Sequence, residues 1–205
     1  IATTNENKLR EIRPLLTAPR QAGLSPAMAW DLVALADLAP VAEPEETGAT
    51  FWENARIKAL AYAQASGLIT VAEDSGLEVD ALGGEPGVRS ARFLGAAATY
   101  EERFAEIYRR LNRRPSTARF VTALAVARGG ELIFETETSV EGMVADSPRG
   151  QHGFGYDPIF LYGPSKTTTA EMTDADKAVI SHRGRAFRNL RRWLESEPAP
   201  LLPFS

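Results

Sequence analysis

Two β-prone runs joined by a pair of glycines constrain the fold of this chain most strongly. Residues 120–127 and 132–140 are rich in β-branched and aromatic side chains, and the second run alternates between apolar and polar residues. Gly129 and Gly130 stand between the runs, and paired glycines favour the tight turn of an antiparallel hairpin. The sequence therefore predicts a β-hairpin over residues 120–140.

Helical spacing of apolar residues, twice behind a Thr-x-x-Glu capping box, predicts the helices. They are expected over residues 9–16, 50–67, 99–111 and 185–194. Short apolar or β-prone runs predict strands over residues 1–4, 32–35, 68–72 and 159–162. Since Ile1 begins inside a predicted strand, we expect a few residues to precede it. The strand 68–72 would deliver Glu73 and Asp74 at its carboxyl end, which is where an open α/β sheet binds ligands.

Composition disfavours several classes of protein. With 205 residues, 44% of them hydrophobic, the chain can build one substantial core, and we expect a single domain over residues 1–205. The 27 acidic and 23 basic side chains give a net charge of -4, which disfavours an RNA-binding module or any binder that needs a broad positive field. No run approaches the roughly 20 apolar residues of a membrane span. The chain has no cysteine, so a reducing cytoplasm is the expected compartment.

The turn after the first predicted strand gathers groups that attract phosphate. Hydroxyls, amides, the backbone N–H groups of a helix start and an ammonium come from Thr3, Thr4, Asn5, Glu6, Asn7 and Lys8. Lys58, four residues after Asn54 on a predicted helix, could reach the same cleft. The alternatives are an ordinary capped turn in the first case and a solvated lysine on an amphipathic helix in the second.

Carboxylates from two separate elements could hold a divalent metal ion. Glu45 and Glu46 precede the predicted helix 50–67, and Asp74 follows a predicted strand beside Glu73. Mg²⁺ takes one or two carboxylates together with phosphate oxygens of a substrate. The alternative for the first pair is favourable charge before a helix amino terminus. For Asp74 the alternative is an aspartate that stabilises a turn.

The segment from Gly153 to Arg183 combines residue types suited to a purine nucleotide. Glycines let backbone approach a ligand closely, aromatic rings can stack on a base, and histidine and arginine can donate hydrogen bonds to carbonyl or phosphate oxygens. The candidate binding residues are Phe154, Gly155, Tyr156, Asp157, Lys177, Ser181, His182 and Arg183. Residues 181–183 could at the same time cap the last predicted helix.

These blocks, in this order, resemble the inosine triphosphatase family of purine nucleoside triphosphate pyrophosphatases. The resemblance runs from Ile1 to about Leu194. It rests on residues 3–8, 46–58, 74–77, 82–92, 153–160 and 177–184. Such blocks in register are far more specific than any one of them. Thr4 stands where many relatives have glycine and Glu73 where many have a second aspartate, which leaves the role of Glu73 open.

The resemblance implies an α/β fold with a long central mixed β-sheet, two lobes around an active-site cleft, and a homodimer. It also implies hydrolysis of inosine, deoxyinosine or xanthosine triphosphate (ITP, dITP, XTP) to the monophosphate and pyrophosphate. The implied ion is Mg²⁺, with Mn²⁺ as the alternative. Glu46 and Asp74 would serve the metal, and Asp74 would also accept the proton. Lys8 would anchor the triphosphate, and Lys58 and Ser75 would contact substrate.

Two other functions stay open. One is a pyrophosphatase for pyrimidine or modified nucleotides, and the pair His182 and Arg183 counts against it. The other is a catalytically silent purine-nucleotide sensor, and the presence of Lys8, Glu46 and Asp74 together counts against that. The sequence does not show which of ITP, dITP and XTP is preferred. It also does not show whether Asp74 acts chiefly as base or as metal ligand. We expect neither nucleic acid nor a membrane among the partners.

Overall fold

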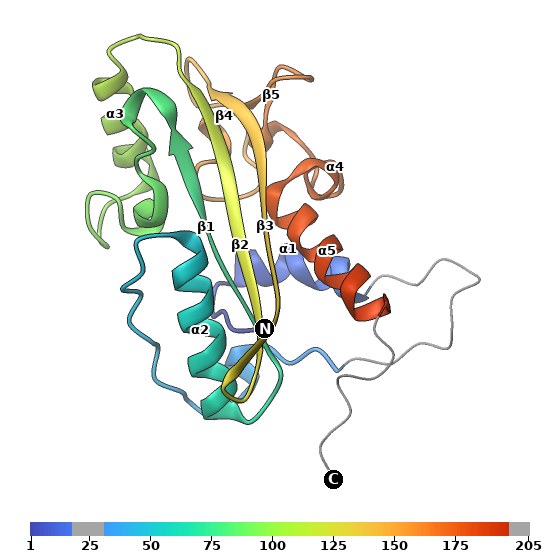
Figure 1. Ribbon diagram of the computed structural model, residues 1–205. Coiled ribbons are helices and arrows are strands. Elements are labelled where there is room, and N and C mark those ends of the chain that lie inside the picture. The colour runs from blue at the N-terminus through green and yellow to red at the C-terminus, as the bar shows by residue number, and fades with distance from the viewer. Residues whose placement is uncertain (18–30, 197–205) are drawn as a thin grey trace, which may run out of the picture.

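An antiparallel sheet forms the centre of the molecule (Figure 1). The computed structural model describes residues 1–17 and 31–196. The strands follow chain order across the sheet, as β1 (Thr70–Val79), β2 (Thr117–Arg128), β3 (Glu131–Val144), β4 (Phe160–Tyr162) and β5 (Thr167–Thr168). The α/β class is confirmed. Each pair of neighbouring strands in the described chain is antiparallel, so the expectation of a mixed sheet was wrong.

The predicted hairpin is confirmed as β2 and β3. Arg128 pairs with Glu131 across the turn, and Gly129 takes a left-handed φ of 56°, which costs glycine little. These strands have 12 and 14 residues and are the longest of the sheet. The turn chemistry therefore located the two strands on which the other elements pack.

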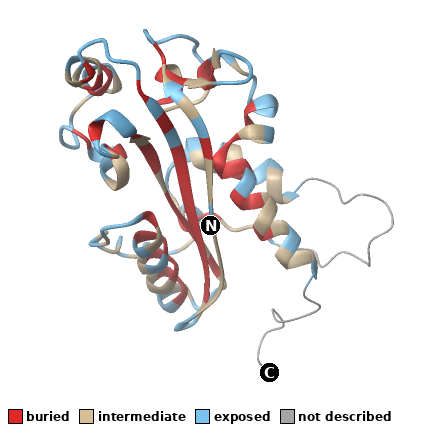
Figure 2. Ribbon diagram, turned by 45° about the horizontal axis from the view of Figure 1, so that its top comes forward, coloured by how far each residue is buried: buried red, intermediate tan, exposed pale blue. Residues whose placement is uncertain are grey.

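Helices cover both faces of the sheet (Figures 1 and 2). They are α1 (Glu6–Thr17), α2 (Phe51–Ser66), α3 (Tyr100–Leu111), α4 (Asp174–Ile180) and α5 (His182–Ser196). On one face α2 packs alanine side chains against β1 and β2, and on the other α1 and α5 enclose Ile12, Leu124 and Phe187. The central strands are therefore buried along much of their length, as Figure 2 shows. No helix in the described ranges is long and apolar enough to cross a membrane.

Local caps set the helix boundaries that the sequence predicted. Thr50 Oγ1 accepts a hydrogen bond from Glu53 N at 3.2 Å, and the Glu53 carboxylate accepts one from Thr50 N at 3.1 Å. Gly67 ends α2 with a φ of 70°. Thr99 and Glu102 form the same box before α3. Both predicted capping boxes are confirmed.

Two predicted strands do not form. Residues 1–4 carry no strand, although Ala2 N donates to Val71 O at 2.8 Å and so places the segment along the edge of β1. Residues 32–35 lead into the short 3-10 helix Leu35–Asp37. Ala34 N donates to the Asp37 carboxylate at 3.2 Å, and this local bond favours a turn over an extended strand.

β1 is longer than predicted, and this changes where its acids point. The expected strand ended at residue 72, whereas β1 runs on through Glu73 and Asp74 to Val79. Because side chains alternate along a strand, Glu73 shares a face with its partner Leu124, and Asp74 shares the opposite face with Ala123. Glu73 therefore faces α1 and α5, and Asp74 faces α2.

β1 is also an edge strand, and its edge is covered at both ends. Val71 O accepts the bond from Ala2, Leu77 N donates to Ser90 Oγ at 2.9 Å, and Val79 N donates to Glu85 O at 3.2 Å. The acids at positions 73 and 74 lie between these covered ends. A ligand at this stretch of edge can thus contact side chains on both faces of the sheet.

Candidate active site

Lys58 joins two acids on the α2 side of β1. Its Nζ lies 2.7 Å from Glu46 Oε1 and 3.0 Å from Asp74 Oδ1. Asn54, one helical turn earlier, donates to Asp74 Oδ2 at 3.2 Å and accepts from Gly48 N at 2.8 Å. The predicted shared face of Asn54 and Lys58 is thus confirmed, and it faces the carboxylates rather than solvent.

Burial and charge act against each other in this group. Burial alone would lower the pKa of Lys58, but Asp74 and Glu46 raise it above its ordinary value, so the ammonium stays charged. Burial raises the pKa of Asp74 although Lys58 opposes the shift. Burial would also raise the pKa of Glu46, but its bonds to Lys58 and Arg92 lower it. The surroundings therefore favour protonation of Asp74 and disfavour protonation of Glu46 relative to their ordinary values.

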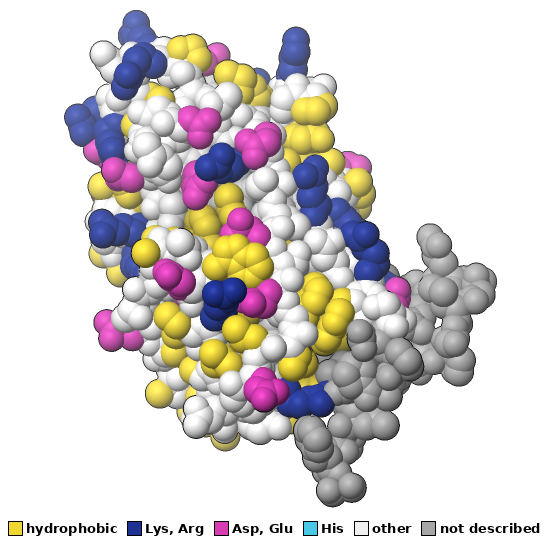
Figure 3. Space-filling view, in the orientation of Figure 1, with side chains coloured by type: hydrophobic (Ala, Val, Ile, Leu, Met, Phe, Trp, Pro, Cys, Tyr) yellow, Lys and Arg dark blue, Asp and Glu magenta, His cyan; other side chains and the backbone are white. Residues whose placement is uncertain are grey.

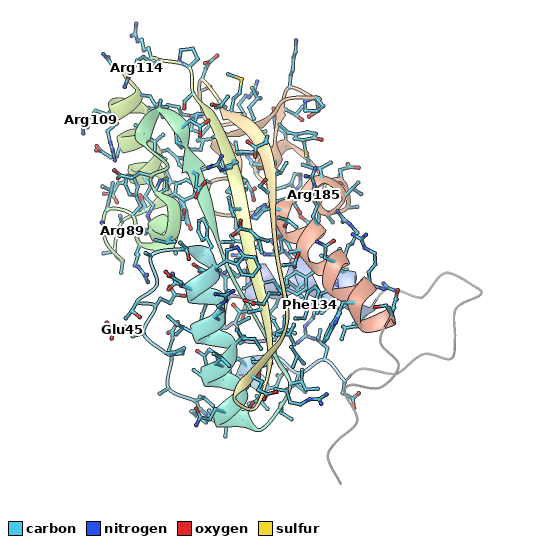
Figure 4. The ribbon with its side chains drawn as sticks, in the orientation of Figure 1. Glu45, Arg89, Arg109, Arg114, Phe134 and Arg185 are labelled. Atoms are coloured by element: carbon cyan, nitrogen blue, oxygen red, sulfur yellow. The ribbon has the colours of Figure 1, made fainter. Side chains whose placement is uncertain are left out.

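Glu45 behaves differently from its neighbour Glu46. Glu45 is exposed and lies outside α2 in Figure 4, whereas the Glu46 side chain is 21% exposed and turns toward Lys58. The predicted pair of acids before α2 therefore supplies one member to the site.

Glu73 holds two cations on the opposite face of the sheet. Its Oε1 lies 3.0 Å from Lys8 Nζ and 3.1 Å from Arg183 Nη2. Arg183 Nη2 also donates to Ser75 Oγ at 2.9 Å. Burial would raise the pKa of Glu73, but Arg183 and Lys8 outweigh it and hold the pKa well below its ordinary range. Residues from α1, β1 and α5 are thereby tied together.

Glu11 belongs to the same network, and the sequence analysis did not include it. Its two carboxylate oxygens accept from Lys177 Nζ and Arg183 Nη1, each at 2.7 Å. Burial would raise the pKa of Glu11, but Arg183 and Lys177 lower it. Glu11 follows Lys8 by three residues on α1, so helical spacing places both on one face. That helical spacing was the sequence signal by which Glu11 could have been included among the candidate residues.

A tight turn brings Phe154 and Asp157 to these cations. Asp157 Oδ2 accepts from Phe154 N at 2.8 Å and from Lys177 Nζ. Gly153 has a φ of 70°, and a Cβ there would overlap the same carboxylate oxygen, so only glycine fits. The Phe154 ring centroid lies 5.2 Å from Lys177 Nζ and 5.4 Å from Arg183 Cζ. The Phe154 ring thus packs against the cationic side chains of Lys177 and Arg183.

The two other predicted base contacts lie in the core. Tyr156 is 3% exposed, packs edge-on against Tyr100 and donates its hydroxyl to Ser90 O at 2.9 Å, so its ring is not available for stacking on a base. His182 stacks on Phe120 with a centroid distance of 4.8 Å. Burial and the nearby cations place its pKa well below the ordinary value, so the imidazole is neutral. Within the described chain, His182 Nδ1 has no hydrogen-bond partner.

The remaining predicted residues form caps and turns. Asn5 Oδ1 accepts from Asn7 N at 3.0 Å and from Lys8 N at 3.3 Å, which caps α1, and Asn5 N donates to Thr3 Oγ1 at 3.1 Å. Ser181 Oγ accepts from Gly184 N at 3.0 Å and caps α5. The exposed residues of the segment 3–8 are Thr4, Asn5, Glu6 and Asn7. Gly155 takes a φ of 66° in the turn.

The charged residues of the candidate site form ion pairs with one another. The cations are Lys8, Lys58, Arg92, Lys177 and Arg183, and each is paired with one or more of Glu11, Glu46, Glu73, Asp74 and Asp157. Figure 3 shows Lys and Arg side chains interspersed with Asp and Glu over the visible face. Each cation of the site is therefore balanced by at least one neighbouring carboxylate in the ligand-free protein.

The chain belongs to the Ham1 family, whose model matches residues 1–193. It is 45% identical to a dITP/XTP pyrophosphatase of Thermus thermophilus over 202 residues, which covers 98% of this chain and 93% of that one. Identity to the dITP/XTP pyrophosphatase of Bacillus subtilis is 42% over 200 residues, covering 96% of each. The family resemblance seen in the sequence is confirmed.

Solved structures show the same fold. A HAM1 protein from Coxiella burnetii superposes with a TM-score of 0.84 at 35% identity, covering 96% of this chain and 97% of that one. The Ham1 protein of Staphylococcus aureus gives a TM-score of 0.83 at 33% identity, with the same two coverages.

Proposed function

We propose that this protein hydrolyses ITP, dITP and XTP to the nucleoside monophosphate and pyrophosphate, which removes them from the nucleotide pool. The observation that carries the proposal is the placement of Asp74 and Glu46 on one side of the β1 edge and of Lys8 and Arg183 on the other. A triphosphate at this edge would meet carboxylates and cations together. The dITP/XTP pyrophosphatase names of relatives at 42–45% identity support it.

The donor set of the site fits a hard divalent cation, and we assign Mg²⁺, with Mn²⁺ as the alternative. Glu46 and Asp74 offer carboxylate oxygens to one shared cation, the Lys58 ammonium. Mg²⁺ takes one or two carboxylates and completes its shell with water and substrate phosphates, so this pair of carboxylates suits it. When bound, it would neutralise phosphate charge.

Asp74 is the proposed proton acceptor in the chemical step. A water oxygen forms a bond to the α-phosphorus, the bond from that phosphorus to the bridging oxygen breaks, and pyrophosphate leaves. The Asp74 carboxylate takes the proton of the water. Lys8 and Lys177 would hold the phosphate chain, so that positioning and charge neutralisation lower the barrier.

The pocket for the base is assigned to Phe154 and Arg183, whereas His182, which is buried against Phe120, is given no contact with the base. Inosine and xanthosine carry a keto acceptor at purine position 6, whereas adenosine carries an amino donor. A hydrogen-bond donor from an arginine or the backbone matches the keto oxygen and clashes with the amino group. An unpaired mismatch of this kind in a buried site can lower kcat/KM for the wrong substrate about 10⁴-fold. We expect Arg183→Ala to narrow the ratio of ITP to ATP turnover. An unchanged ratio would place discrimination elsewhere.

Assembly and compartment complete the proposal. We assign one domain with two lobes, and a homodimer that sedimentation of the purified chain would detect. The absence of cysteine from all 205 residues suits a reducing environment and supports a cytoplasmic location. Nucleic acid and membranes are not among the proposed partners, because the net charge is -4.

Product analysis tests the proposed reaction. The protein and Mg²⁺ are incubated separately with the triphosphates of inosine, xanthosine, adenosine, guanosine and thymidine, and the products are resolved by ion-exchange chromatography. We expect monophosphate and pyrophosphate from inosine and xanthosine triphosphates. Turnover of thymidine triphosphate alone would favour the pyrimidine alternative, and no turnover of any nucleotide would favour the sensor.

A further inference from the structure

Both oxygens of Glu46 are held by cations from different elements. Lys58 of α2 lies 2.7 Å from Oε1, and Arg92, at the end of the 3-10 helix Gly87–Arg92, lies 3.0 Å from Oε2. A divalent ion that uses Glu46 would add a third positive charge beside this carboxylate and would repel both cations. The identity of the cation that gives way decides how the site accepts a metal.

Lys58 is the less movable of the two. It is 8% exposed, and it is shared between Glu46 and Asp74. Pulling its ammonium away would leave a second buried carboxylate without a cation, which is costly. Arg92 is different, because its side chain is 48% exposed and it lies on the wall of a groove of 1140 Å³. A guanidinium that leaves Glu46 thus has solvated space to enter.

The backbone that carries Arg92 is firmly held. Two residues before it, Ser90 Oγ accepts from Leu77 N at 2.9 Å and donates to Gly87 O at 2.7 Å. Ser90 O accepts from the Tyr156 hydroxyl at 2.9 Å. Because β1 and the core fix this segment, Arg92 can release Glu46 by rotation of its side chain alone.

We propose that Arg92 is a positioning residue that acts as a latch on Glu46, holding the carboxylate in the ligand-free protein and competing with the incoming divalent cation. This inference rests on the metal site of the proposed function. A metal ion on Glu46 would withdraw the carboxylate charge from Arg92 and repel the guanidinium. The latch therefore weakens metal binding and keeps the carboxylate oriented until the metal arrives.

Direct titration of Mn²⁺ into the ligand-free protein tests the latch. Free Mn²⁺ is followed by electron paramagnetic resonance for wild type, Arg92→Gln, Arg92→Lys and the matched control Arg89→Gln. Arg89 lines the same groove and lies on the same short helix (Figure 4). Since a partly exposed ion pair contributes little, we expect Arg92→Gln to lower the Mn²⁺ Kd by about two- to fivefold. The Kd of Arg92→Lys should lie between those of wild type and Arg92→Gln. The Kd of Arg89→Gln should match that of wild type.

The outcomes separate the latch from the metal site itself. An unchanged or higher Kd for Arg92→Gln overturns the latch. A purely structural role of Arg92 would weaken metal binding in this variant and so raise the Kd. Glu46→Gln serves as the reference for loss of the site. If wild type and Glu46→Gln take up Mn²⁺ equally poorly, Glu46 binds no metal in the ligand-free protein and the latch fails, whereas the reaction of the proposed function is judged separately by product analysis. If Glu46→Gln alone loses Mn²⁺ while Arg92→Gln equals wild type, only the latch is wrong.

Discussion

Replacing Glu73 with glutamine removes one negative charge from a buried network while keeping the shape of the side chain. Glu73 is 4% exposed, and its partner Arg183 is 3% exposed, so the guanidinium cannot turn to water when the charge is lost. The Lys8 side chain is 18% exposed and can move outward in part. Removing one partner of a buried ion pair costs about 3–5 kcal/mol, and we expect Glu73→Gln to lose that much stability at pH 7.

Thermal unfolding measures this loss. For a chain of this size, 1 kcal/mol shifts Tm by about 2–4 °C, so the expected decrease is about 6–20 °C. The exposed Glu45→Gln is the matched control and should change Tm by less than about 2 °C. A decrease below about 3 °C for Glu73→Gln would refute the view that this carboxylate holds the two cations in place.

The pH dependence gives a second check. The pKa of Glu73 is lower in the folded protein than in the unfolded chain, so its contribution is fully present above the unfolded pKa of about 4.3. That contribution is lost as the pH falls through the folded pKa. The stability gap between wild type and Glu73→Gln should be constant from pH 6 to 8 and narrow below about pH 4. A gap that stays constant into acid would contradict the assignment.

Four other substitutions test separate parts of the account. Asp74→Asn should lower kcat about a hundredfold, and near-normal turnover would remove Asp74 as the base. Lys58→Gln should move the acid limb of the pH–rate profile to higher pH, because Lys58 opposes the raised pKa of Asp74; a shift to lower pH would count against that coupling. Thr50→Ala should cost about 1 kcal/mol in denaturant unfolding through loss of the α2 cap, and an unchanged midpoint would mean that the cap contributes nothing. Gly76→Ala should cost about 1–3 kcal/mol in the same assay, since its Cβ would overlap Ser90 Oγ; a neutral result would show that the 3-10 segment moves freely.

Features set by local chemistry were predictable from the sequence. The capping box of Thr50 and the glycines of the β2–β3 turn depend on residues within a few positions, so pattern alone located α2 and the hairpin. β1 was cut short because Glu73 and Asp74 interrupt its apolar run. The cations that allow these acids inside a strand come from α1, α2 and α5, which no local pattern reveals.

Long-range contacts also decided which candidate residues lie at the candidate site. Tyr156 sits in a glycine-rich motif typical of a binding turn, but its neighbours in space are Tyr100 and Ser90, so its ring fills the core. Glu11 has no motif of its own and is important because Lys177 and Arg183 meet it from the other end of the chain. Burial and charge pairing of this kind depend on the assembled fold.

Hydrolysis of ITP in ¹⁸O-labelled water tests the central claim most directly, because that claim is attack of water on the α-phosphorus beside Asp74. Mass spectrometry of the separated products reports which one carries the label. The account predicts ¹⁸O in inosine monophosphate and none in pyrophosphate. Label in pyrophosphate would mean attack at the β-phosphorus, and label in released phosphate would mean stepwise loss of the terminal group; either result would contradict the proposed role of the site.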